Sequence, residues 1–67
     1  MAEPRVSQRD FMRALVRKHG RHKDVVCAAY AAAEEAGQVP RLRNASRYTA
    51  AAYAEALWRD GERRGWL

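Results

Sequence analysis

Pro40 constrains the fold of this chain more than any other residue. Because proline has no backbone N–H and biases the residue before it away from helical geometry, a helix cannot run through residues 39 and 40. Gly37 adds a helix stop just upstream, and Gly20 adds another nearer the start of the chain. The chain therefore divides into three segments, and in each of them apolar residues recur with the period of an α-helix.

The first predicted helix begins after Ser7 and ends at Gly20. Ser7 and Asp10 have the spacing of a capping box, with Asp in place of the usual Glu, so both are expected to bind free N–H groups. The apolar stripe of this helix consists of Phe11, Met12, Leu15 and Val16.

The second predicted helix runs from about residue 23 to residue 36 and is stopped by Gly37. It is rich in alanine, the best helix former and the smallest apolar side chain, so it can lie close to its neighbours. We expect Glu34 and Glu35 on the outside. The inward face is predicted to contain Val26, Ala29, Tyr30 and Ala33.

The third predicted helix follows the connector and begins at Ser46 or Thr49, since either side chain suits an N-cap. Gly61 is predicted to end this helix or to kink it. Val39 and Leu42 are predicted to fill the core from the connector. The inward stripe of the third helix is predicted to be Ala50, Tyr53, Ala54, Leu57 and Trp58.

The tail carries Trp66 and Leu67. A tryptophan is costly to leave in water, so we expect it to fold back over the first or the third helix as a lid. The alternative is an apolar anchor for a second copy of the chain or for a larger protein.

Together these segments predict a compact all-α domain of three helices over residues 7–67, preceded by a flexible arm at residues 1–6. The lone Cys27 cannot close an internal disulfide, and the sequence has no set of four ligands spaced for zinc. A reducing, cytoplasmic setting is therefore expected. No apolar run approaches the roughly 18 residues of a membrane span.

The net charge of +5 is concentrated in two segments that hold no carboxylate. Five basic residues lie between Asp10 and Asp24, and three arginines lie between Glu35 and Glu55. Segments of one sign attract polyanions and speed encounter with them, although the same charge also suits a surface that is merely solvated. The residues predicted to grip a nucleic-acid backbone from the first segment are Arg13, Arg17, Lys18, Arg21 and Lys23.

The connector before the third helix has the composition of a base-reading segment. Its candidate binding residues are Arg41, Arg43, Asn44, Ser46 and Arg47. The arginine fork binds phosphate through two N–H groups and binds guanine in the same way, whereas asparagine pairs with adenine. Arg43 and Asn44 are therefore the best candidates for contacts to base edges.

Ala33 and Gly37 have the spacing by which the first helix of a helix-turn-helix pair meets its turn. On these residues the chain resembles small helix-turn-helix DNA-binding domains. The resemblance implies duplex DNA as partner, read by the connector and the start of the third helix. The chain departs from the pattern at Pro40, since a long connector occupies the place of the recognition helix.

We therefore predict a small DNA-binding protein, either a transcription-type regulator or an accessory module of a mobile element. RNA is less favoured because the aromatic residues, Tyr48 excepted, fit helix core positions rather than an open stacking surface. The rival prediction is a protein-interaction adaptor that docks a larger partner through its alanine-rich helix faces and Trp66.

No catalytic constellation is evident in the sequence. His19, His22, Asp24 and Cys27 are close together, but their spacing matches no familiar zinc site, and a cysteine inside an apolar helix is usually an inert core residue. We predict no enzymatic activity, no metal and no cofactor.

Overall fold

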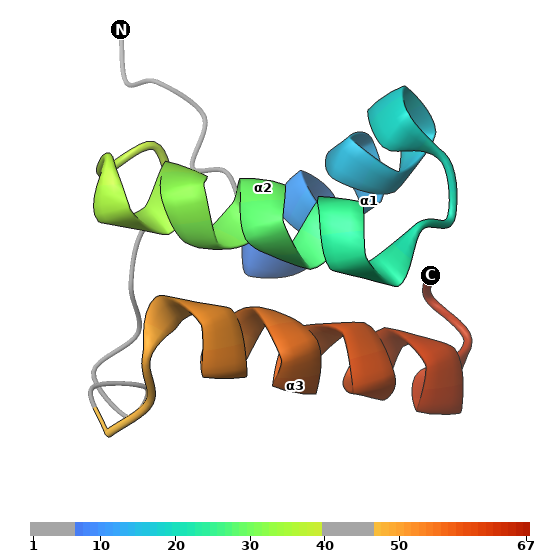
Figure 1. Ribbon diagram of the computed structural model, residues 1–67. Helices are drawn as coiled ribbons and strands as arrows, with labels where there is room; N and C mark the ends of the chain where they lie inside the picture. The colour runs from blue at the N-terminus through green and yellow to red at the C-terminus, as the bar shows by residue number, and fades with distance from the viewer. Residues whose placement is uncertain (1–6, 40–46) are drawn as a thin grey trace, which may run out of the picture.

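The computed structural model describes residues 7–39 and 47–67, of which 74% are helical, and no strand occurs among them. The helices are α1 (Gln8–His19), α2 (Lys23–Glu35) and α3 (Ala50–Arg64) (Figure 1). The predicted all-α, three-helix class is confirmed. The predicted arm at residues 1–6, together with Pro40 and Leu42, lies outside the described residues.

The caps explain where the helices begin and end. The Ser7 hydroxyl accepts a hydrogen bond from the Asp10 amide at 3.1 Å and begins α1, which ends at Gly20. At the end of α2, Gly37 adopts φ +76°, and the Gln38 amide donates to the Ala33 carbonyl at 2.9 Å. A glycine with positive φ and a hydrogen bond back to the last turn are typical of a glycine C-cap, so α2 ends where the sequence predicts.

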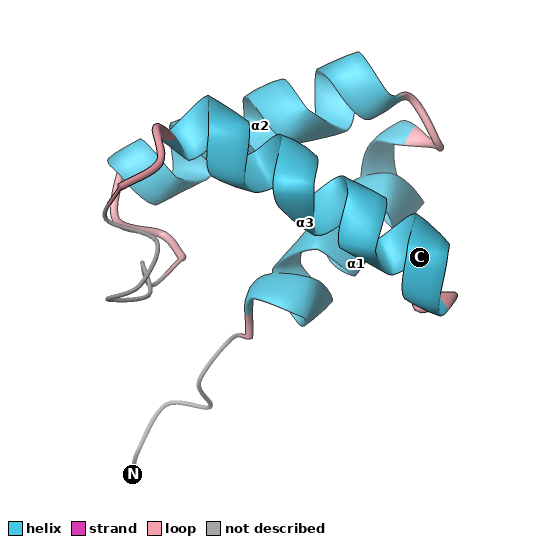
Figure 2. Ribbon diagram, turned by 90° about the horizontal axis from the view of Figure 1, so that it is seen from below, coloured by secondary structure: helices cyan, strands magenta, loops and turns pink. Residues whose placement is uncertain are grey.

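The two longer helices form the body of the domain. In Figure 1, α2 and α3 lie side by side and run in opposite directions. In Figure 2, where α3 is nearest the viewer, α1 passes behind α3 and crosses its direction. The most extensive packing is between α2 and α3. None of the described helices combines the length and apolarity needed to cross a bilayer.

Tyr30 of α2 lies at the centre of the core and is fully buried. The edge of its ring meets Phe11 of α1 at a centroid distance of 5.9 Å, and its other neighbour is Tyr53 of α3 at 6.1 Å. Burial is the main cause that raises the pKa of the Tyr30 hydroxyl. The buried apolar residues around it are Met12, Val26, Ala33, Val39, Ala54 and Trp58.

Val39 fills the core from the connector, as predicted, but the position predicted for Glu34 is wrong. Glu34 is only 7% exposed, whereas Glu35 is exposed. Glu34 follows Tyr30 by four residues, so helical geometry places it on the same face as the core residues. Burial is the main cause that raises the pKa of Tyr53, and the charge of Glu34 adds to the raised pKa of both Tyr53 and Tyr30.

The prediction that Gly61 ends α3 is also wrong. The helix continues to Arg64 and is capped by Gly65, which adopts φ +79°. Gly61 is buried, and a Cβ at this position would lie only 2.5 Å from Leu67 Cγ. The glycine is therefore needed for a close approach of the tail, not for a helix end.

Candidate nucleic-acid interface

The outer surface of α1 carries the clearest group of uncompensated cations. Arg13, Arg17 and Lys18 are all exposed, and among the described residues no carboxylate bonds to any of them. The four-residue spacing of the two arginines separates them by about 6 Å along the helix axis. Arg13 and Arg17 therefore lie in one row, and Lys18 is exposed next to Arg17 in sequence; we call these three residues the α1 basic face (Arg13, Arg17 and Lys18).

A third arginine of α1, Arg9, precedes Arg13 by four residues and contacts side chains of the protein itself. Arg9 lies with its guanidinium carbon 5.5 Å from the centroid of the Trp66 ring, and its Nη2 is 3.9 Å from Asp60 Oδ2. Both contacts hold a cation against the end of α3, through the ring face and through opposite charge.

Two further predicted backbone-gripping residues are bonded within the chain. Arg21 Nη2 donates to the backbone oxygen of Leu67 at 2.7 Å. Lys23 Nζ donates to Glu55 Oε1 at 3.3 Å across the α2–α3 junction. These two side chains thus contribute to tertiary structure, which the count of charges in the sequence does not reveal.

The connector is described only at its end. Arg41, Arg43, Asn44 and Ser46 lie outside the described residues, while Arg47 is exposed just before α3. Thr49 is the N-cap of α3, and its hydroxyl accepts from the Ala52 amide at 3.1 Å.

The first turn of α3 holds no acidic residue. The positive end of the helix dipole is therefore not neutralised there, and Arg47 lies beside it.

The α1 basic face and the start of α3 belong to different ends of the α2–α3 pair. Figure 1 places the turn between α1 and α2 at one end of α2, and the chain enters α3 at the other end. The 13 residues of α2 span about 20 Å at 1.5 Å per residue. The two basic segments that the sequence shows thus lie at different ends of the α2–α3 pair.

The carboxylates that bind cations gather on α3. Glu55 Oε1 accepts from Arg59 at 2.8 Å as well as from Lys23, and Asp60 Oδ1 accepts from Arg63 at 3.2 Å and from Arg64 at 2.9 Å. The hydrogen bond from Lys23 is the main cause that lowers the pKa of Glu55. The arginines on the second half of α3 are therefore compensated, in contrast to the α1 basic face.

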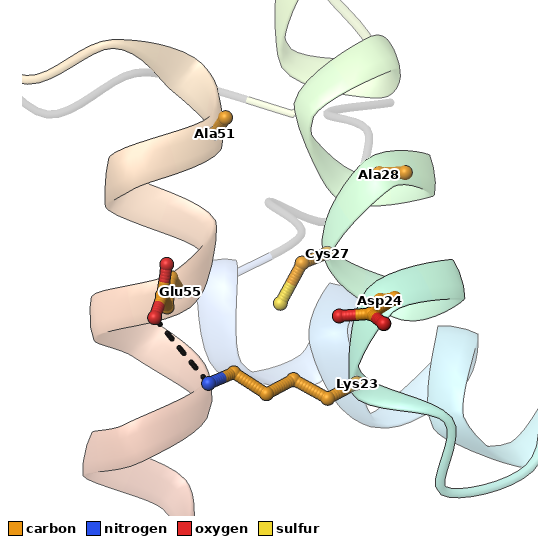
Figure 3. Close-up of a pocket in the computed structure, with 6 residues that line it drawn as sticks. All are labelled: Lys23, Asp24, Cys27, Ala28, Ala51 and Glu55. Carbon is orange, nitrogen blue, oxygen red and sulfur yellow. Dashed lines mark hydrogen bonds and ion pairs between the residues drawn. The ribbon is translucent and has the colours of Figure 1, made fainter.

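A shallow hollow of about 290 Å³ lies between α2 and α3 (Figure 3). The Cys27 sulfur points into it, and Lys23 reaches across to Glu55. Burial is the main cause that raises the pKa of the Cys27 thiol, which disfavours the nucleophilic thiolate at neutral pH. Within residues 7–39 and 47–67, no three His, Cys, Asp or Glu side chains are grouped to hold a metal ion.

The arrangement of the helices bears on the helix-turn-helix resemblance. Residues 36–49 separate α2 from α3, far more than the three or four residues of the motif's turn. A three-residue turn containing Gly20 joins α1 to α2 instead. The turn between α1 and α2 therefore has the length that the motif requires. The second helix of that pair is nevertheless poorly suited to DNA, because the exposed face of α2 carries Asp24 and Glu35, whose carboxylates repel phosphates.

Sequence reasoning did not identify Asp60 as a centre of contacts. It binds Arg9, Arg63 and Arg64 and also accepts from Trp66 Nε1 at 3.1 Å. The spacing of three and four residues from Asp60 to the two later arginines was the available signal.

No family model, no curated protein and no solved structure matches this chain.

Proposed function

We propose that this chain is a small basic DNA-binding protein of the cytoplasm, a regulator or an accessory module of a mobile element. The observation that carries the proposal is the α1 basic face, whose three cations are exposed and have no carboxylate partner among the described residues. Exposed cations of this kind bind phosphate and release the counterions of the duplex.

A second support comes from the start of α3. Arg47 is exposed beside a helix N-terminus that has no acidic residue in its first turn. Backbone N–H groups and the helix dipole favour an anion there, and side chains at the start of a helix are well placed to reach base edges. In this proposal the connector reads bases while α1 holds the backbone.

The test measures binding of fluorescein-labelled, random-sequence duplex DNA by anisotropy over a series of salt concentrations. In the triple variant Arg13→Ala, Arg17→Ala, Lys18→Ala, the slope of log K against log salt should fall by about 1 for each lost phosphate contact. Unchanged affinity and slope in this variant would reject the α1 basic face as a phosphate-binding surface.

The matched control is the triple variant Arg59→Ala, Arg63→Ala, Arg64→Ala, which lowers the net charge by the same amount. These arginines bond to Glu55 or Asp60 in the folded chain. Removing them should change the salt slope less than removing the α1 basic face. Equal losses in the two variants would show that total charge, and not the α1 basic face, governs binding.

A second candidate function is docking of a larger protein on the outer face of α2. Val25 is 49% exposed there, and Ala28 and Ala32 are exposed on the same face of the helix. An apolar helix face suits a helical partner. A Val25→Lys variant that leaves DNA affinity intact but abolishes recovery of a cellular protein partner would favour this function.

A further inference from the structure

The segment after α3, residues 65–67, folds back on the domain and is called the tail below. The amides of Gly65, Trp66 and Leu67 all donate to the Gly61 carbonyl, at 2.9, 3.0 and 3.3 Å. Trp66 and Leu67 then pack against the hydrophobic core. Backbone bonds and apolar packing together hold the tail in one position.

Two residues of the tail contact arginines at the two ends of α1. The backbone oxygen of Leu67 accepts from Arg21, which follows α1, and the Trp66 ring lies under the guanidinium of Arg9, near the start of α1. Arg9 continues the four-residue spacing of Arg13 and Arg17. The docked tail therefore engages the two arginines that would extend the α1 basic face at its two ends.

Docking depends on the missing side chain at Gly61. A Cβ built there lies 2.5 Å from Leu67 Cγ and 2.7 Å from Leu67 Cδ1, distances that Cβ atoms do not tolerate. The Gly61→Ala substitution therefore forces the Leu67 side chain out while adding a residue that favours helix. It disturbs the packing of the Leu67 side chain, and with it the docking of the tail, without changing any charge.

We propose that the tail regulates the polyanion site by competing with phosphate for Arg21 and Arg9, an inference that rests on the proposed function. A phosphate binds the arginine fork through two N–H groups, and the Leu67 oxygen already occupies Nη2 of Arg21. Binding of the tail and binding of DNA at these arginines therefore weaken each other by the same factor.

The experiment repeats the salt series with random-sequence duplex DNA on two variants that weaken the docking of the tail by different means, Gly61→Ala and Trp66→Ala. Each should bind more tightly than the wild type, with a salt slope steeper by about 1 to 2, because up to two arginines gain phosphates. Circular dichroism checks that the helices are retained.

Two controls make the result specific. The double variant Gly61→Ala, Leu67→Ala removes the clashing Cγ and Cδ1 atoms, although it also removes the Leu67 packing and leaves a Cβ 3.1 Å away, so the slope should return only part of the way to that of the wild type. Arg21→Ala should lower the slope by about 1 in the Gly61→Ala background and by less in the wild type, because only the released arginine contributes.

The outcomes separate the two proposals. If the wild type binds DNA and both tail variants keep its affinity and slope, the competition is overturned and DNA binding stands. If neither the wild type nor any variant binds DNA at low salt, the proposed function fails, and the competition fails with it.

Discussion

The side chain of Asp60 connects α3 to the tail and to α1. Its two carboxylate oxygens bind Arg63, Arg64 and the Trp66 ring nitrogen, and Arg9 lies nearby. The hydrogen bond from Trp66 is the first cause that lowers the Asp60 pKa, followed by the bond from Arg63, while partial desolvation acts in the opposite direction. The charge on this carboxylate therefore helps to hold the tail.

The lowered pKa predicts a loss of stability in acid. A carboxyl group whose pKa is lower in the folded chain contributes stability that is complete above its ordinary pKa of about 4 and is lost as the pH falls through the folded value. Urea unfolding of the wild type between pH 7 and pH 2 should show this decline. Asp60→Asn should show a weaker dependence over the same range, and an identical dependence would mean that Asp60 does not contribute.

The N-cap at Thr49 determines where the whole of α3 begins. Thr49 bonds the Ala52 amide, and the three alanines that follow it offer no side chain that could replace this bond. An uncapped helix start leaves N–H groups that only water can satisfy. The cap also fixes where α3 begins relative to Arg47.

Thr49→Ala should lower the free energy of unfolding by about 1 kcal/mol, the usual effect of losing an N-cap side chain. Chemical denaturation followed by far-UV circular dichroism measures the loss. Thr49→Ser keeps the hydroxyl and should retain most of the stability. If both substitutions destabilise equally, the methyl group and not the cap is responsible.

The helix boundaries could be predicted from the sequence because the residues that set them are local. Ser7, Gly20 and Gly37 act through backbone groups within a few positions, so their effects are readable without the fold. Gly61 was misread because the atom that requires a glycine, Leu67 Cγ, reaches it only after the chain reverses. Glu34 was misread because charge was given more weight than its helical position next to Tyr30.

The candidate site could be predicted only in part, because some of its residues have partners that are distant in the sequence. Exposure of Arg13, Arg17 and Lys18 follows from helical spacing, so the α1 basic face was within reach of the sequence. The partners of Arg21 and Lys23 come from residues 46 and 32 positions away, and no local pattern signals them.

At the scale of the whole molecule, the basic residues form two regions that α2 keeps apart. One region is the α1 basic face, and the other is the start of α3 with Arg47. Figure 1 shows the turn that follows α1 and the start of α3 at opposite ends of α2. Residues that share no partner and lie more than about 10 Å apart contribute independently to binding. Each region should therefore contribute to affinity without help from the other.

Independence can be measured by combining variants. Arg43→Ala with Arg47→Ala should weaken binding to duplex DNA by orders of magnitude and lower the salt slope by about 2, with no change in far-UV circular dichroism. Added to the triple variant of the α1 basic face, the reductions in slope should sum to about 5. A combined variant that loses no more than one set alone would indicate a single shared phosphate site.

The length of α2 has a geometric consequence for any duplex that meets both regions at once. Its 13 residues extend over about 20 Å, and each strand of DNA advances 3.4 Å per nucleotide. A duplex that lies along α2 must therefore extend over roughly six base pairs to pass both ends of this helix, and a shorter fragment in that orientation could not.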